Sequence, residues 1–420
     1  MKCKPIRMKT PLDLEKADLG LQTLPLKHVM VYKGTLDSRL GAFALHSHIA
    51  EMDKTLVVTF SVHWQDEDAP GQYMRYTFST DGGKTWSDPY SEKAVLFPKM
   101  EKALLNPSLM DENGRIQGCR QHDKCGTGQK SENSWENDNC GHYHLMLCAN
   151  GFAKVDGRLY AIGEVAKGVN YPGIGRLARE VKSDGSLGPI FWVNENIPNL
   201  SEITPHAENA ELYAKAPYGG ELAKKIASYL ADARHMPQWD MDPVGWPLPD
   251  GETYRTWRRK FEEKYGIPCC EPTYSYEASD GVHIRWWRSK FNIQHAQYSF
   301  DQGKTWTEIT DTEFPDTGAR TNVGNLPSGR VFAIGNFGHK RHQLCLSLSD
   351  DGYTFDKTVV LAHSAELVRH RGRAKGHGFH YPHACILNDT LYISYAKNKE
   401  DIFVALVPLS ELEKREPVKG

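Results

Sequence analysis

The chain has 420 residues, of which 40% are hydrophobic and 25% are charged, as in an ordinary folded protein. Its 51 Lys and Arg residues nearly balance its 53 Asp and Glu residues, so no overall charge would attract nucleic acid or a membrane surface. No apolar stretch reaches the roughly 18 residues of a transmembrane helix. The sequence therefore predicts neither a nucleic-acid-binding nor a membrane protein.

The first residues, MKCKP, lack the apolar segment of a secretory signal. We therefore expect either a cytoplasmic protein or an exported one whose leader has been removed. The 9 cysteines are an odd number, which does not indicate a closed framework of disulfides.

A turn followed by a short apolar strand recurs along the chain. The turns are Asp53-Lys54, Asn113-Gly114, Asp156-Gly157, Asp280-Gly281, Ser328-Gly329 and Asn388-Asp389. Asn-Gly and Asp-Gly pairs supply the positive φ angles of a tight hairpin. These six units, with a seventh expected in the longest interval, predict an all-β fold: a seven-bladed β-propeller, with six blades as the alternative.

A second repeat has the form S-x-D-x-G-x-T-W. It occurs at residues 79–86 and 299–306, and a degenerate third copy occurs at 350–355. The Asp side chain of such a box accepts hydrogen bonds from turn amides, while the Gly permits a left-handed backbone. These Asp boxes support the propeller but assign no chemistry.

Residues 207–261 interrupt the rhythm of strands with a helical pattern. Leu222, Ile226 and Leu230 recur at helical spacing and form an apolar stripe. We expect residues 1–420 to form one propeller domain with 207–261 inserted as a packing element, a dimerisation element or a substrate lid.

Histidines and cysteines gather in a few places. His46 and His48 alternate in a predicted strand, so both are expected to point to one side of it. Another group has ligand chemistry for a divalent metal such as zinc, and its members are Cys119, His122, Cys125, Cys140, His142 and His144. Disulfides between Cys119, Cys125, Cys140 and Cys148 are the alternative in an exported protein.

Arginines and tyrosines supply the other candidate site residues. An Arg guanidinium binds a sugar carboxylate through two parallel donors, and a Tyr beside an Arg has a lowered pKa suited to proton exchange. The residues considered for these roles are Arg176, Arg179, Arg285, Arg288, Arg320, Tyr160, Tyr274, Tyr276 and Tyr381. Lys375 and His380, close to Tyr381 in sequence, are added as substrate-binding candidates.

Several segments resemble a known group of proteins. They are residues 66–72 with the first Asp box, 176–180 with 184–192, 324–330, 377–386 and 395–404. They are similar to segments of the bacterial BNR-repeat propellers of the sialidase superfamily, which include rhamnosyl-glucuronate lyases, related rhamnosidases and ulvan lyases. The Arg-Ile-Pro segment of true sialidases is missing.

The resemblance implies catalytic roles that differ with the activity. The lyase relatives use two His, a Tyr and an Arg, which in this sequence fall on His122, His142 or His144, Tyr160 and Arg176. The rhamnosidase relatives rely on one His near the first strands, which in this sequence is His28 or His48. A divalent metal, calcium or zinc, is the one cofactor that the sequence leaves open.

Three functions follow from this reading, all with a glycan as partner. The first is a polysaccharide lyase that removes the C5 proton of a rhamnose-linked uronic acid after Arg176 neutralises its carboxylate. The second is a glycoside hydrolase, rhamnosidase- or sialidase-like, for which the available carboxylates are Glu67, Asp68, Glu208 and Glu271. The third is a propeller that binds a glycan without catalysis.

Overall fold

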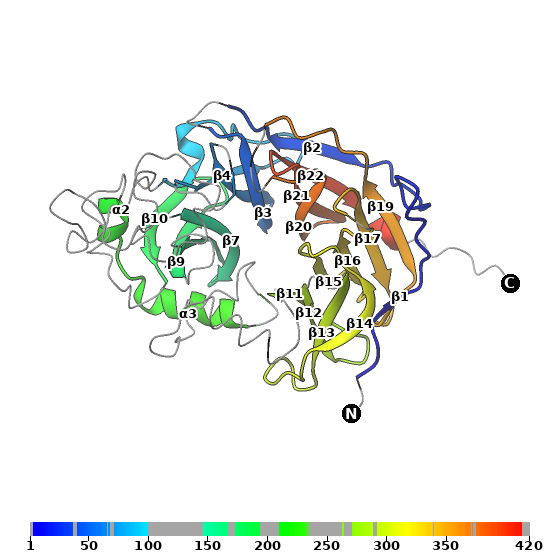
Figure 1. Ribbon diagram of the computed structural model, residues 1–420. Helices are drawn as coiled ribbons and strands as arrows, with labels where there is room; N and C mark the ends of the chain where they lie inside the picture. The colour runs from blue at the N-terminus through cyan, green and yellow to red at the C-terminus, as the bar shows by residue number, and fades with distance from the viewer. Residues whose placement is uncertain are drawn as a thin grey trace.

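The computed structural model shows β-sheets arranged radially about a common centre (Figure 1). The structure describes residues 3–36, 40–64, 66–67, 71–99, 146–166, 173–193, 210–232, 235, 263, 271–288, 292–338, 340–370, 372 and 375–413. They form five sheets, each of which runs from an innermost strand near the centre to an outermost strand.

The first sheet contains β3 (Phe43–Met52), β4 (Thr55–His63), β5 (Tyr73–Ser79) and β6 (Val95–Phe97), the last preceded by the short helix η1 (Glu92–Ala94). The second contains β7 (Met146–Val155), β8 (Arg158–Ala166), β9 (Gly173–Val181) and β10 (Leu187–Trp192). The third contains β11 (Glu271–Glu277), β12 (His283–Arg288), β13 (Ile293–Ser299) and β14 (Thr310–Pro315), extended by β1 (Arg7–Met8) and β18 (Thr354–Phe355).

The fourth sheet contains β15 (Asn322–Asn325), β16 (Val331–Gly335), β17 (Leu344–Ser349) and β19 (Lys357–Ala362). The fifth contains β20 (Phe379–Leu387), β21 (Thr390–Lys397), β22 (Asp401–Pro408) and β2 (Lys27–Tyr32). Because β2 pairs antiparallel with β22, with Val29 opposite Val404, a strand near the start of the chain completes the sheet made by its end.

The core lies between neighbouring sheets. Strand β4, TLVVTFSVH, is buried along its whole length because its β-branched and aromatic side chains pack on both faces. One apolar cluster joins the first sheet to the second and the fifth, and includes Phe60, Leu159 and Val404. The radial packing of sheets expected of a propeller is therefore present in the described part of the chain.

Five of the six predicted turns join the two innermost strands of a sheet. Asp156, Gly157, Gly281, Gly329 and Asn388 have the positive φ angles that such hairpins require. The sixth turn, Asn113-Gly114, lies outside the described residues. The described residues of the predicted all-β propeller, with its Asp boxes and helical insertion, thus form five sheets. Whether the complete propeller has seven blades or six stays a prediction.

All three predicted Asp boxes form. In the first, the Asp81 carboxylate accepts hydrogen bonds from the backbone amides of Lys84 and Thr85, both at 3.0 Å, and from the Ser79 hydroxyl at 2.8 Å. Asp301 and Asp351 make corresponding bonds in the other two. Each box follows the third strand of its sheet.

The two ends of the sheets therefore differ. Ser79, where the first box begins, pairs with Leu56 at the start of β4, whereas Phe43 at the start of β3 pairs with His63 at the end of β4. We call the end with the boxes the box end, and the end where the innermost strands begin the entry end.

Helices are few in the part of the chain that the structure describes: α2 (Ala210–Lys215), α3 (Gly220–Ala231) and α5 (Leu409–Glu413). The predicted stripe is confirmed in α3, where Ile226 and Leu230 are buried against the second sheet beside Phe191. Among the described helices, none is long and apolar enough to cross a membrane. In the 207–261 insertion, residues 207–209, 233, 234 and 236–261 lie outside the described residues.

Candidate active site

Register shifts typical of β-bulges interrupt four of the innermost strands, and those in β3 and β20 carry side chains of the candidate site. In β3 the register with β4 shifts between Leu45 and His48, and in β20 the register with β21 shifts between His380 and His383. His46 (φ 56°) and Tyr381 (φ 49°), which lie inside these bulges, have left-handed backbones. Non-glycine residues rarely adopt this conformation, and strain of this kind concentrates at functional sites.

The two bulges bring their side chains together. The rings of His46 and Tyr381 are stacked, with centroids 5.8 Å apart and an interplanar angle of 18°. Both residues are buried. The bulges thus aim an imidazole and a phenol into the same place at the entry end.

Two arginines flank the phenol. Arg288 at the end of β12 donates from Nη1 to the Tyr381 hydroxyl at 3.3 Å, and the guanidinium of Arg341 lies 5.3 Å from the centroid of the same ring. Burial by itself raises the pKa of Tyr381, but the positive charges of Arg288 and Arg341 outweigh burial, so that the pKa lies below its ordinary value. The arginines therefore favour the phenolate.

An ion pair lies against this phenol. Glu67, between β4 and β5, accepts a hydrogen bond from Lys399 in the turn between β21 and β22, and its Oε1 lies 3.2 Å from His46 Nε2. Burial raises the pKa of Glu67, but the charge of Lys399 and the bond from His46 lower it further than burial raises it. Burial lowers the pKa of Lys399, and Glu67 more than reverses this. Both groups are therefore charged at neutral pH.

The histidines of the site are neutral. Burial lowers the pKa of His46 and holds that of His380 well below its ordinary value. Arg341 can only donate to His380 Nδ1, at 3.1 Å, so His380 carries its proton on Nε2 and donates it to the Gly376 carbonyl at 2.9 Å. His46 likewise donates from Nε2 to Glu67, while its Nδ1 lies 3.1 Å from the Ser61 hydroxyl.

These residues come from four sheets and meet at one end of them. The site is built by the first sheet (His46, Glu67), the third (Arg288), the fourth (Arg341, between β16 and β17) and the fifth (Tyr381, Lys399). We call these six residues the Tyr381 cluster. Because the Asp boxes occupy the opposite end, the cluster and the boxes are separated by the length of the strands.

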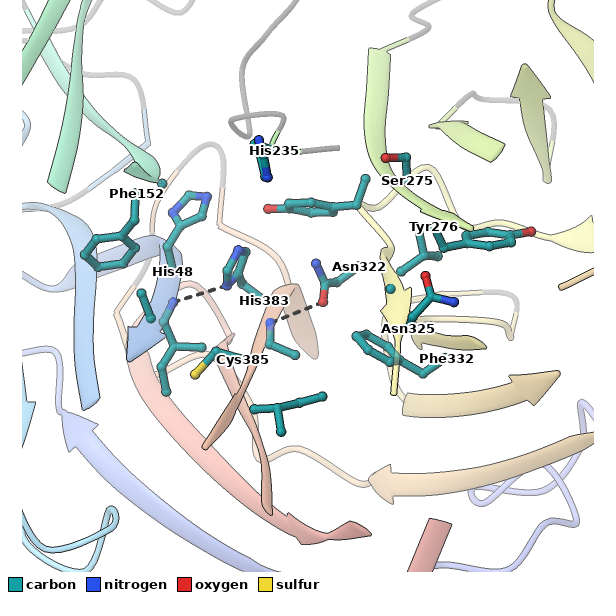
Figure 2. A pocket seen from close by; sticks show the side chains of 18 of the residues that line it. His48, Phe152, His235, Ser275, Tyr276, Asn322, Asn325, Phe332, His383 and Cys385 are labelled. Atoms are coloured by element: carbon teal, nitrogen blue, oxygen red, sulfur yellow. Dashed lines mark hydrogen bonds between the residues drawn. The ribbon is translucent and has the colours of Figure 1, made fainter. Parts of the chain in front are cut away.

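On the box-end side of the Tyr381 cluster, the innermost strands line a cavity of about 600 Å³ (Figure 2). His48 from β3, His383 from β20 and Tyr274 from β11 lie on its wall, and the rings of His48 and His383 are 5.0 Å apart. Lys154 in the second half of β7 and Cys385 in the second half of β20 also line the cavity, which therefore extends from the His48 level towards the box end. We call this cavity the channel pocket.

The structure brings some of the predicted site residues together. Arg288, His380 and Tyr381 lie in or against the Tyr381 cluster. Arg320 is 2% exposed, and its charge adds a smaller effect to burial, which is the main cause of the lowered pKa of His46 and His48. Lys375 donates to the Ala42 carbonyl at 2.6 Å and to Glu400 at 3.2 Å.

Other predicted residues lie elsewhere. Tyr160 is buried beside Phe191 in the apolar cluster under α3, and burial raises its pKa. Arg179 donates to the carbonyls of Gly188 and Leu96. Arg176 lies opposite Glu164 in the β8–β9 pairing. All three belong to the second sheet, and the structure does not bring them to Tyr381.

The predicted metal ligands Cys119, His122, Cys125 and Cys140, like His142 and His144, lie outside the described residues. Within the described ranges, no group of three or more His, Cys, Asp or Glu side chains could hold a metal ion. A metal site in this chain therefore stays a prediction from sequence.

The expectation that His46 and His48 point to one side is wrong. The bulge in β3 interrupts the alternation, so His46 meets Glu67 and Tyr381 while His48 lines the channel pocket with His383. His28, the alternative to His48, lies in β2 at the outer edge of the fifth sheet and contacts the Tyr395 hydroxyl at 2.9 Å.

Sequence reasoning missed Arg341 and Lys399. Both lie in connections between the two middle strands of a sheet, and they meet Tyr381 only when different sheets assemble. A partial signal existed for Lys399, since it directly precedes Glu400-Asp401 within the family-like segment 395–404.

Comparisons with known proteins bear on the fold. Residues 247–393 match the model of the BNR repeat-like domain. No curated protein is significantly similar to the chain in sequence.

Solved structures resemble almost the whole chain. A sialidase is 19% identical with a TM-score of 0.69, and the match covers 96% of this chain but only 35% of the sialidase. Trypanosoma rangeli sialidase, in a covalent intermediate with 2,3-difluorosialic acid, is 12% identical with a TM-score of 0.52 (94% and 60% covered). The NanB sialidase of Streptococcus pneumoniae is 10% identical with a TM-score of 0.50 (91% and 70% covered). The chain thus spans about a third of the length of the first sialidase, and it has a sialidase-like β-propeller fold.

Proposed function

We propose that the chain is a carbohydrate-active enzyme, and that it is a glycoside hydrolase acting on a sugar that bears a carboxylate. The observation that carries this proposal is the buried Tyr381 hydroxyl, held 3.3 Å from Arg288 with the guanidinium of Arg341 beside its ring. A phenolate formed there is a nucleophile, and tyrosine serves as the nucleophile of sialidases.

The charges of the Tyr381 cluster favour an anionic substrate. Arg288, Arg341 and Lys399 carry three positive charges, and only Glu67 among the six residues carries a negative one. A guanidinium binds a carboxylate through parallel hydrogen bonds in a fixed geometry. An acidic sugar would therefore be held with its carboxylate beside Tyr381.

The reaction would proceed in two steps. Tyr381 gives up its proton to water and its oxygen attacks the anomeric carbon; the bond to the leaving group breaks, and the leaving oxygen takes a proton back from water. Water then cleaves the tyrosyl–sugar bond, which releases the sugar with its original configuration and returns the phenol. Glu67, ionised and paired with Lys399, holds His46 against the phenol and does not act as the acid.

The fold likeness supports a covalent route. The Trypanosoma rangeli sialidase with which this chain shares its fold is described as a covalent intermediate with 2,3-difluorosialic acid. The test is to incubate the protein with that compound and with fluorinated uronosyl fluorides, and then to map the labelled peptide by mass spectrometry. A label on Tyr381 supports the proposal, and labelling of another residue, or of none while the acidic glycoside is hydrolysed, contradicts it.

β-Elimination at a 4-linked uronic acid, including one linked to rhamnose, is the second candidate. It is favoured by the neutral His46 stacked on a phenol whose pKa is lowered by arginines, because a lyase needs a base beside a neutralised carboxylate. Elimination gives an unsaturated product that absorbs in the near ultraviolet, whereas hydrolysis gives only new reducing ends. Time courses with ulvan, rhamnose-capped glucuronate glycans and sialosides separate the two reactions.

A further inference from the structure

The channel pocket contains a buried hydrogen-bond acceptor. His48 is 1% exposed, and its Nδ1 lies 3.0 Å from the carbonyl oxygen of His46. A carbonyl only accepts, so the His48 proton is on Nδ1 and its Nε2 presents a lone pair. Among the residues that the structure describes, Nε2 has no hydrogen-bond partner. Buried polar atoms in proteins are rarely left in this state.

A donor stands next to this acceptor. His383 Nδ1 accepts a hydrogen bond from the backbone amide of Ile49 at 3.3 Å, so the proton of His383 is on Nε2. The rings of His48 and His383 are 5.0 Å apart on the same wall (Figure 2). One hydroxyl group can donate to the first ring and accept from the second, which neither a carboxylate nor an ammonium group can do.

The rest of the wall suits a neutral ligand with apolar faces. Lys154 is paired with Glu51, so its charge is already matched. Burial lowers the pKa of His48 well below its ordinary value and lowers that of His383 to about 4, so both rings are uncharged at neutral pH. The Phe and Tyr residues that line the pocket are Phe152, Tyr229, Tyr274, Tyr276 and Phe332.

We propose that the channel pocket is a second ligand site, which binds a small neutral saccharide through one hydroxyl held between His48 and His383. Its volume of about 600 Å³ falls within the range of small-molecule pockets, roughly 300–1,000 Å³. The Asn322 side chain, whose Oδ1 accepts from Ala384 N at 3.2 Å, supplies a further amide donor on the wall. The site differs from the Tyr381 cluster because it offers uncharged groups where the cluster offers arginines.

The test uses the intact chain with ¹⁵N-labelled histidine. D-glucose, D-galactose and L-rhamnose are titrated separately, and the Nε2 resonance of His48 is followed by nuclear magnetic resonance. We expect at least one sugar to shift this resonance saturably, and D-glucuronate to bind the pocket at least tenfold more weakly than D-glucose. If none of the three sugars shifts the resonance, the pocket holds only water and the proposal is wrong.

Variants separate this site from the proposed active site. His48→Phe removes the acceptor and should weaken sugar binding at least tenfold, whereas the control His28→Phe, on the outer strand β2, should leave it unchanged. Tyr381→Phe should also leave it unchanged. Binding that survives in His48→Phe but disappears in Tyr381→Phe would place the sugar in the Tyr381 cluster and overturn the proposal. The resonance shift in the unmodified protein decides the matter even if His48→Phe does not fold.

Discussion

Arg288 donates a hydrogen bond to the phenolic oxygen of Tyr381 at 3.3 Å, although the two residues are 93 positions apart in the chain. The contact joins the third sheet to the fifth, and Tyr381 makes it from inside the bulge in β20, where its backbone is left-handed. A buried tyrosine normally has a raised pKa, as Tyr276 and Tyr395 have in this protein. At Tyr381, by contrast, the charges of the neighbouring arginines lower the pKa more than burial raises it.

Replacement of Tyr381 by Phe should abolish turnover of an acidic glycoside. The variant keeps the ring that stacks on His46 but loses the nucleophilic oxygen, so we expect kcat to fall on the order of a thousandfold or more. The matched control is Tyr353→Phe, which removes a hydroxyl bonded to Asp280 at the box end. We expect Tyr381→Phe and Tyr353→Phe to have similar thermal unfolding midpoints but very different kcat values. Equal activity in the two variants would show that Tyr381 is not the nucleophile.

Replacement of Arg288 by Gln should shift the pH dependence of activity upward. The Arg288 charge lowers the pKa of Tyr381, so its loss raises that pKa and moves the rise of activity with pH to higher pH, by about one unit or more. The measurements are pH profiles of kcat/KM and an ultraviolet titration of the phenol. Arg330→Gln is the control, because Arg330 pairs with Asp350 beside an Asp box. An unchanged profile in Arg288→Gln contradicts the assigned role.

Much of the fold is readable from the sequence because its signals are local. A turn such as Asp156-Gly157 or a box such as residues 79–86 acts within a few positions, and the structure contains them as predicted. The stripe of α3 is equally local, since Ile226 and Leu230 lie one turn apart on one helix face.

The site is less predictable because it depends on departures from local rules. Alternation places His46 and His48 on one side, and only the bulge in β3 separates them. Tyr381 and His380 could be named as candidates from a family-like segment, but their partner Arg341 lies in an unremarkable turn. Likewise, Tyr160 is indistinguishable in sequence from a site tyrosine, yet it lies in an apolar cluster. Assembly of different sheets decides which polar residues meet.

Replacement of Asp351 by Ala should lower stability without affecting catalysis. Asp351 accepts hydrogen bonds from the amides of Tyr353 at 2.8 Å and Thr354 at 2.7 Å, and these amides lose their partner in the variant. We expect the thermal unfolding midpoint to fall by about 2–4 °C. Asp351→Asn, which retains an acceptor oxygen, should lose less. Unchanged kcat in both is expected because the box lies at the opposite end from Tyr381, and a large loss of kcat would contradict that separation.

Replacement of Lys399 by Met should destabilise the protein far more than a surface substitution. It leaves Glu67 charged and buried without its main partner, which costs about 3–5 kcal/mol of unfolding free energy. The double variant Glu67→Gln, Lys399→Met has no buried charge at the pair and should recover part of this loss. Chemical denaturation at neutral pH measures the unfolding free energies of the unmodified protein, of Lys399→Met and of the double variant. If the double variant is no more stable than Lys399→Met alone, the cost does not arise from the unpaired carboxylate.

The same pair gives a pH dependence of stability with a defined sign. Since the pKa of Glu67 is lower in the folded state, its contribution is fully present above the unfolded glutamate value of about 4.3 and is lost as the pH falls towards the folded value. The pKa of Lys399 is raised on folding, so its contribution is present below the ordinary lysine value and is lost as the pH rises through the folded one.

Glu67→Gln should therefore flatten the loss of stability in acid, as measured by denaturation at a series of pH values. Glu366→Gln, which removes an exposed carboxylate paired with Lys397, is the control and should flatten it much less. An acid limb as steep in Glu67→Gln as in the unmodified protein would mean that Glu67 does not carry the folded-state charge inferred from its contacts with Lys399 and His46.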